Sequence, residues 1–289
     1  MPDRSTIPLL DVSGVTVDYG HGPARTRVLH GVDLTVQPGE VVGLIGESGS
    51  GKTTLARAIL GLVPLTRGEV RFDGAQISDL GGRRRRAFRR SGALQYVFQD
   101  PLLSLDPDLP AGASVAEGLR VRGGLAPATI AERVTEAFIA VGLDPGLADR
   151  RPAALSGGQR QRVVVARALV LEPKLVLLDE PVSALDSANR IQILRLLDGL
   201  GATRSIAQVF ISHDLGSVAG IAGRVVVLYR GRVVEDGPTE RVLNRPQHPY
   251  TKLLVGSAPT LTAGAATRED RRALREALAA HTDAEAAQP

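Results

Sequence analysis

The chain has 289 residues, and at roughly 150 residues per domain this length predicts two domains or one large domain with an insertion. It contains no cysteine, which excludes disulfides, thiolate zinc sites and a cysteine nucleophile, and its net charge of +4 is too small to indicate nucleic acid as a partner. No apolar run approaches the ~18 residues that cross a bilayer, and the N-terminus lacks the apolar core of a signal peptide. We therefore expect a soluble intracellular protein.

The first predicted elements are strands. Apolar and polar residues alternate over 12–18 and 32–36, which is typical of half-buried antiparallel strands. The uninterrupted apolar run 41–45 instead favours a strand buried on both faces, as in a parallel sheet. A glycine-rich loop follows, and then the helical spacing of 52–62. This order is strand, glycine loop, helix.

The middle of the chain has a different character. Prolines at 101, 107 and 110 predict a loop, and the spacing of apolar residues over 126–141 predicts a helix. We interpret 96–165 as a mainly helical insertion. Six arginines within 83–90 could contact phosphate or lipid headgroups. The interpretation that we favour is a solvated face beside the insertion.

Buried strands return at 175–178 and 209–212, separated by a predicted helix over 188–200. The segments 225–228 and 232–235, joined through Arg230-Gly231, predict a hairpin. After Thr260 the composition shifts to alanine, arginine and glutamate, which indicates a short helix and then a frayed, flexible end.

The glycine loop carries the clearest chemical motif. Its residues fit the pattern G-x-x-x-x-G-K-[ST] between a predicted strand and a predicted helix: Gly46, Glu47, Ser48, Gly49, Ser50, Gly51, Lys52 and Thr53, followed by Thr54. Glycines let successive backbone N–H groups turn toward a phosphate, and the following helix N-terminus adds positive potential. Lys52 would contact the β- and γ-phosphates, and the Thr53 hydroxyl would ligate Mg²⁺.

Two further strand ends carry polar residues. Asp179 and Glu180 follow the buried strand 175–178, where Asp179 can hold Mg²⁺ through water and Glu180 can polarise an attacking water. His213 closes another buried strand, at the sheet edge where ligands bind in open α/β sheets, and could hydrogen-bond the γ-phosphate. Spacing alone does not decide between two interpretations of the next loop, a second anion-binding loop or a glycine-rich helix N-cap. Its residues are Leu155, Ser156, Gly157, Gly158 and Gln159.

Together these motifs resemble the ATP-binding cassette (ABC) ATPases, the motor subunits of ABC transporters, over about residues 8–258. LSGGQ at 155–159 is similar to the family signature, which binds ATP of a partner subunit, and lies between the P-loop and LVLLDEP in the expected order. Gln99 resembles the Q-loop glutamine, His213 the switch histidine and Tyr19 the aromatic residue that stacks on adenine. The D-loop is matched by Ser183, Ala184, Leu185 and Asp186. For Tyr19, ordinary strand packing remains an alternative.

The resemblance implies an α/β fold: a P-loop NTPase (RecA-like) core with an antiparallel β subdomain over 8–95 and 166–245, the helical insertion 96–165, and a C-terminal extension 246–289. It implies ATP and Mg²⁺, with Thr53, Gln99 and Asp179 near the metal, and Glu180, His213 and Gln99 as catalytic residues. Implied partners are a paralogous ATPase subunit in a homo- or heterodimer, two transmembrane permeases and, indirectly, an extracytoplasmic solute-binding protein. Such a subunit is peripheral on the cytoplasmic face of the membrane.

Residues 237–240 (GPTE) and 247–251 (QHPYT) are similar to the dipeptide/oligopeptide/nickel permease branch of importers. This resemblance implies uptake of peptides or related small solutes. A nickel or metal-chelate importer remains an alternative, as does a soluble ABC-type ATPase that acts on DNA or ribosomes. The second alternative is weakened because this chain has one cassette, no cysteine zinc module and no heptad array.

Overall fold

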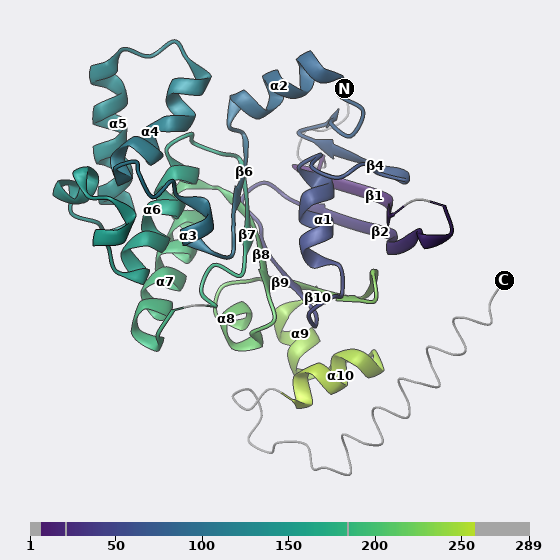
Figure 1. Ribbon diagram of the computed structural model, residues 1–289. Coiled ribbons are helices and arrows are strands. Elements are labelled where there is room, and N and C mark those ends of the chain that lie inside the picture. Colours follow the sequence, from purple (N-terminus) through teal and green to yellow (C-terminus); the bar gives the residue numbers. More distant parts are fainter. Residues whose placement is uncertain (1–6, 21, 184, 258–289) are drawn as a thin grey trace. The chain divides into compact units, whose positions relative to one another are not determined.

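The computed structural model describes residues 7–20, 22–183 and 185–257, and these form two compact units. The first unit takes the described residues up to 11, together with 35–40 and 70–209. The second takes 12–34, 41–69 and 210–257. The expected features after Thr260 lie outside the described residues. Figure 1 labels the elements of both units.

The second unit contains the strand, loop and helix that the sequence predicts around the glycine loop. Strand β3 (Val41–Ile45) leads through that loop into helix α1 (Lys52–Ile59). Strand β9 (Arg224–Tyr229) pairs in parallel with β3, with Ile45 opposite Val227. The continuous apolar sequence of β3 is explained by burial of Val42, Leu44 and Ile45, each at most 1% exposed.

The predicted hairpin at the end of this unit is present. Strand β10 (Arg232–Pro238) runs antiparallel to β9, with Arg232 opposite Tyr229. The rest of the unit consists of strands and short helices, namely most of β1 (Leu10–Tyr19), η2 (Gly22–Ala24), most of β2 (Thr26–Val36), the start of β4 (Arg67–Phe72), the end of β8 (Ala207–Ser212), α8 (Leu215–Ala219), α9 (Thr239–Asn244) and α10 (Pro249–Gly256). β1 lies beside β2, as expected for the predicted strand pair.

The first unit combines parallel strands with a group of helices. Strands β6 (Leu94–Val97) and β7 (Leu175–Asp179) pair in parallel from Leu94 opposite Leu175 to Val97 opposite Leu178. All five residues of β7 are buried. The unit also holds the end of β4, β5 (Ala75–Gln76), α2 (Gly82–Ser91), α3 (Pro101–Ser104), α4 (Ala111–Arg122), α5 (Pro127–Ala140), η3 (Pro145–Asp149), η4 (Pro152–Ala154), α6 (Gly157–Leu169), α7 (Ser187–Arg204) and the start of β8.

Helices α4, α5 and α6 lie against one another (Figure 1), and each buries apolar side chains. Leu119 of α4, Phe138 of α5 and Val163 of α6 are each 0% exposed. These helices account for about half of the 96–165 segment, which the sequence predicts to be mainly helical. Within the described residues no helix is both long and apolar enough to cross a membrane.

One segment differs from the sequence prediction, and one helix was not predicted. Residues 101–110 were expected to form a loop, but Pro101–Ser104 is a short helix because Asp100 caps it, accepting from the Leu102 N–H at 2.8 Å. The arginine-rich segment is helix α2, in which every residue is at least partly exposed. That exposure agrees with the solvated face that we favoured.

Candidate functional site

The P-loop begins where β3 ends, and its first glycine is required by close backbone packing. Gly46 has φ +156°, and a Cβ at this position would lie 2.2 Å from the Leu228 carbonyl oxygen and 2.7 Å from Ser50 Oγ. The loop ends at Gly51, which has φ +107° and precedes α1. Among the described residues no side chain caps α1, so its first N–H groups keep the arrangement suited to an anion.

Lys52 lies against this loop rather than extending into solvent. Its Nζ donates to the Gly46 carbonyl at 2.7 Å and to the Glu47 carbonyl at 2.9 Å, and lies 3.5 Å from Ser50 Oγ. The lysine is 7% exposed. Thr53 and Thr54 follow it in the first turn of α1 and are half-buried. The loop, lysine and threonines therefore form one compact group.

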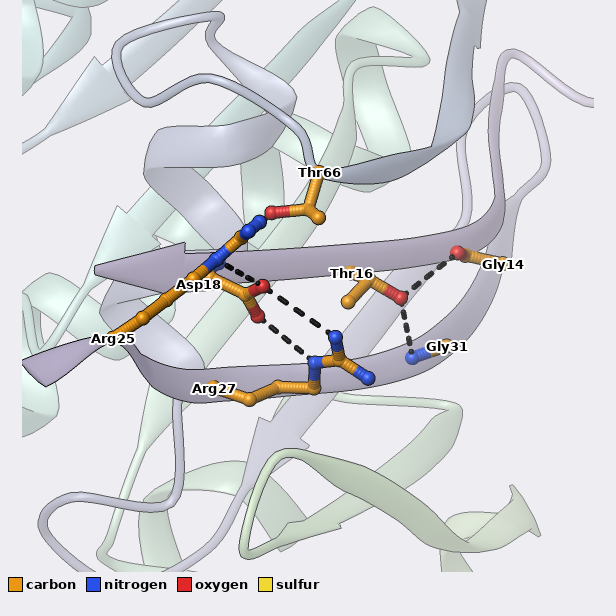
Figure 2. A network of polar contacts seen from close by, with 7 residues as sticks. All are labelled: Gly14, Thr16, Asp18, Arg25, Arg27, Gly31 and Thr66. Atoms are coloured by element: carbon orange, nitrogen blue, oxygen red, sulfur yellow. Dashed lines mark hydrogen bonds and ion pairs between the residues drawn. The ribbon is translucent and has the colours of Figure 1, made fainter. Parts of the chain in front are cut away.

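Tyr19 ends β1, and the preceding residue, Asp18, belongs to a polar network (Figure 2). The Asp18 carboxylate accepts from Arg27 Nε at 2.9 Å and pairs with Arg25 Nε at 2.8 Å, while the Asp18 N–H donates to Thr66 Oγ1 at 3.2 Å. The hydrogen bond from Arg27 lowers the pKa of Asp18, and the charges of Arg25 and Arg27 add to the shift. This network fixes the end of β1, and the Tyr19 side chain is 39% exposed.

His213 lies directly after β8, and the neighbouring residues are tightly held. Ser212 is buried, and its Oγ accepts from the Asp214 N–H at 2.9 Å. Asp214 in turn caps α8, accepting from the Gly216 N–H at 3.1 Å. The His213 side chain is exposed. The histidine thus projects from a rigid turn at the carboxyl end of a buried strand.

Two neighbouring carboxylates of the first unit, Asp179 and Glu180, each accept a hydrogen bond from an identified donor. Asp179, at the end of β7, is 4% exposed and accepts from Tyr96 Oη at 2.5 Å. Glu180 accepts from Gln99 Nε2 at 2.9 Å. Two of the three expected catalytic residues, Gln99 and Glu180, are therefore in direct contact. The contact of Tyr96 with Asp179 was not expected from sequence.

The backbone of Glu180 is strained. Its φ is +46°, a conformation that non-glycine residues seldom adopt. The Glu180 carbonyl accepts from both the N–H and the Oγ of Ser183, at 3.2 and 3.1 Å, which holds the turn in place. Such strain concentrates at functional sites, where the surrounding structure enforces it.

The LSGGQ loop is a helix N-terminus with a capping box. Ser156 Oγ accepts from the Gln159 N–H at 3.2 Å, and Gln159 Oε1 accepts from the Ser156 N–H at 2.9 Å. Leu155 is 4% exposed and anchors the loop, while Ser156 and Gly157 are exposed. Gly158 lies against α7, because a Cβ there would come within 2.5 Å of Asn189 Oδ1.

The expected D-loop precedes α7. Asp186 caps this helix, accepting from the Asn189 N–H at 2.9 Å and from Asn189 Nδ2 at 2.6 Å. The backbone hydrogen bond from Asn189, followed by that from its side chain, lowers the pKa of Asp186. Ser183 is exposed and Leu185 half-buried, while Ala184 lies outside the described residues.

The C-terminal part of the second unit contributes a contact to the P-loop that the sequence did not predict. The Glu47 N–H donates to Tyr250 Oη at 2.7 Å, although the two residues are 203 positions apart. Tyr250 is 1% exposed and stacks on Tyr229, with ring centroids 4.1 Å apart. Burial raises the pKa of Tyr250 to about 12, so its phenol stays neutral at physiological pH.

The comparisons with known proteins agree with these motifs. The ABC transporter family matches residues 29–183, and the C-terminal region of oligopeptide/dipeptide transporters matches residues 234–283. A putative peptide import ATP-binding protein of Brucella ovis is 44% identical over 268 residues, covering 93% of this chain and 83% of the relative. The glutathione import ATP-binding protein GsiA of Escherichia coli is 47% identical over 81% of this chain and 38% of its own length.

Solved structures show the same fold. The ATP-binding cassette MJ0796, in a dimeric post-hydrolysis state bound to ADP and Pi, has a TM-score of 0.73 and 32% identity, covering 80% of this chain and 98% of that one. CbiO1 from Clostridium perfringens, part of the ABC transporter complex cbiONQ, has a TM-score of 0.74 and 30% identity, covering 86% and 95%.

The chain belongs to the ABC transporter family, as an ATP-binding cassette with the α/β fold of the P-loop NTPases. It is accordingly an ATPase. Within that family it carries the C-terminal region of the oligopeptide/dipeptide transporters.

Proposed function

We propose that this chain is the ATP-hydrolysing subunit of an importer that takes up peptides or related small solutes through separate permeases. The observation that carries the proposal is the joint match of its two segments, the cassette at 29–183 and the oligopeptide/dipeptide C-terminal region at 234–283. The relative from Brucella ovis, which spans nearly the same length and is named a putative peptide import protein, supports the same substrate class.

Nucleotide binding is assigned to the second unit. The N–H groups of the P-loop and of the first turn of α1 would bind the phosphates, and Tyr19 would stack on adenine. Lys52 would exchange its bonds with the Gly46 and Glu47 carbonyls for bonds to the β- and γ-phosphates. His213 would hydrogen-bond the γ-phosphate.

Mg²⁺ fits the donor groups that the sequence assigns to it. The Thr53 hydroxyl, the Gln99 amide oxygen and, through water, the Asp179 carboxylate are the oxygen ligands that this ion prefers. The Gln99 amide nitrogen donates to Glu180, so the amide oxygen is the atom that remains for a metal. When bound, the ion neutralises charge on the β- and γ-phosphate oxygens.

Hydrolysis is assigned to Glu180 as the general base for the attacking water. Its side chain is only half-buried, and Gln99 Nε2 holds one of its oxygens, which orients the carboxylate. A general base contributes about 10²–10⁴-fold to the rate. The restraint of the Glu180 backbone by Ser183 supports this role, since a base must be held in one geometry.

A second ATPase subunit, identical or paralogous, is proposed to share the site. The N-terminus of α6 is exposed at Ser156 and Gly157, and an added Cβ at Gly157 would meet open space. A helix N-terminus open in this way can receive the γ-phosphate of ATP held by the partner. ATP would then favour the closed dimer and hydrolysis would release it. The D-loop, 183–186, would face the same interface.

Two permeases are the proposed membrane partners. An extracytoplasmic solute-binding protein would deliver the transported solute to them. The first unit exposes a set of large apolar side chains around α3: Phe98 (48%), Leu102 (56%), Leu103 (87%) and Leu109 (40%). Because Phe98 adjoins Gln99, a permease segment bound to this apolar surface would be coupled to the catalytic residues. With permeases as its membrane partners, the subunit would bind peripherally at the cytoplasmic face of the membrane.

The nucleotide assignment is tested by Lys52→Ala in the full chain, with Lys174→Ala as the matched control. Lys174 and Asp73, which both belong to the first unit, form an exposed ion pair. Equilibrium binding of Mg-ATP should weaken at least about tenfold in Lys52→Ala, because a charged hydrogen bond is worth about 1.5–3 kcal/mol. Equal affinity in Lys52→Ala and wild type would contradict the proposal.

A further inference from the structure

The hydrogen bond between Tyr250 and the P-loop joins the C-terminal segment of the chain to the nucleotide loop. The donor is the N–H of Glu47, the second residue of the loop, and the acceptor is a phenol oxygen 2.7 Å away. Since the Tyr250 ring is 1% exposed and stacked on Tyr229 at an interplanar angle of 28°, the hydroxyl is held in one place. The loop is thus restrained by a rigid side chain.

Tyr250 is itself anchored through a buried carboxylate. Glu235 of β10 is 7% exposed and accepts from the N–H groups of Gln247 and His248, each at 3.1 Å, and from Arg241 at 3.3 Å. His248 Nδ1 accepts from the Tyr250 N–H at 3.1 Å and so caps α10. Hydrogen bonds therefore link β10 through His248 to the backbone of Tyr250, whose hydroxyl accepts from Glu47.

The P-loop is restrained a second time from the β9–β10 turn. The Gly231 N–H donates to the Ser50 carbonyl at 2.8 Å, and the Gly231 carbonyl accepts from the His30 N–H at 2.9 Å. Gly231 has φ +75°, and a Cβ there would come within 2.0 Å of the Val28 carbonyl oxygen. Glu47 and Ser50 are therefore held by two different segments, so the residues between them have little freedom.

We propose that Tyr250 is a positioning residue for ATP binding: its hydroxyl holds the Glu47 amide and thereby keeps the P-loop in the conformation that receives the phosphates. The inference rests on the proposed function, because it assumes that this loop binds ATP. A loop ordered before binding loses less conformational entropy when the ligand arrives, and the affinity is correspondingly higher. The segment 234–283 that matches the oligopeptide/dipeptide region thus contributes directly to the nucleotide site.

Tyr250→Phe isolates the hydroxyl, because phenylalanine keeps the ring and its stacking on Tyr229. Tyr229→Phe is the matched control, since it removes a hydroxyl from the other ring of the same stack. In Tyr250→Phe the Kd for Mg-ATP and the KM of the ATPase should rise about three- to tenfold, the range set by one hydrogen bond. The kcat at saturating ATP should stay within about twofold, and Tyr229→Phe should match wild type in all three quantities.

Glu235→Gln provides a second variant, which weakens the anchor and leaves Tyr250 in place. It should raise the Kd for Mg-ATP by a smaller factor than Tyr250→Phe does. Thermal melting checks that each variant is folded. Unchanged Kd in both Tyr250→Phe and Glu235→Gln would overturn the inference, and so would an equal rise in Tyr229→Phe. Lys52→Ala is measured in parallel: if it binds Mg-ATP as wild type does, the nucleotide assignment fails rather than the role of Tyr250.

Discussion

Tyr96 offers a sharp test of how the site is held together. Its hydroxyl donates to the Asp179 carboxylate, which is 4% exposed at the end of β7. The substitution Tyr96→Phe removes this donor and keeps the ring, which packs edge-on against Phe98 with centroids 4.5 Å apart. The substitution therefore removes the hydrogen bond from Tyr96 to a buried acidic group and keeps the aromatic contact.

The structure sets the size of the expected effect. A hydrogen bond to a charged group contributes about 1.5–3 kcal/mol, and removing one partner leaves the other buried without it. For a chain of this size 1 kcal/mol corresponds to about 2–4 °C, so the melting temperature should fall by about 3–12 °C. Because the donor also orients Asp179, the Mg²⁺ concentration for half-maximal ATPase activity should rise about tenfold or more.

Thermal melting and a Mg²⁺ titration of phosphate release measure these two effects on the same preparations. Tyr229→Phe, which removes a phenol hydroxyl from the second unit, is the control for both. If Tyr96→Phe has the melting temperature of wild type and the same Mg²⁺ dependence of phosphate release, the Tyr96 contact does not support Asp179. The reasoning is then refuted. A fall in melting temperature with unchanged Mg²⁺ dependence would confine Tyr96 to a structural role.

Two other predictions concern single contacts. The pKa of Asp18 is lowered mainly by Arg27, so the stability gained from this pairing is fully present above the ordinary aspartate pKa of about 3.9 and lost as pH falls through the lowered value. The difference in urea midpoint between wild type and Asp18→Asn should be constant above about pH 5 and shrink below about pH 4; a pH-independent difference would refute this. Ser156→Ala removes the capping box of α6 and should cost about 0.5–2 kcal/mol in urea unfolding, whereas an unchanged midpoint would show that the cap is not stabilising.

The sequence predicts the fully buried strands β3 and β7 for an identifiable reason, whereas β4, β5 and β6 were not among its predicted elements. The continuous apolar runs at 41–45 and 175–178 correspond to β3 and β7, because strands buried on both faces tolerate almost no polar residue. Helix α2 has no such signal, since a run of arginines on an exposed helix lacks apolar periodicity. Helix α3 depends on one cap, Asp100, within a segment whose prolines suggest a loop.

The site shows a similar division between local motifs and distant contacts. The P-loop between β3 and α1, and the buried Asp179 at the end of β7, follow from contiguous residues. The contacts of Tyr96 with Asp179 and of Tyr250 with Glu47 join positions 83 and 203 residues apart, and no periodicity encodes such pairs. The motif at 247–251 includes Tyr250, but its similarity to an importer branch does not indicate a contact with the P-loop.

The central claim is that Glu180 activates the water that cleaves ATP bound by this chain. Glu180→Gln tests it most directly, since the amide keeps the shape and the contact distance to Gln99 but is no longer a base. Mg-ATP binding and phosphate release are measured on the same purified full-length protein. The account predicts binding within about twofold of wild type and turnover reduced by about 10²-fold or more. Turnover equal to wild type would contradict it.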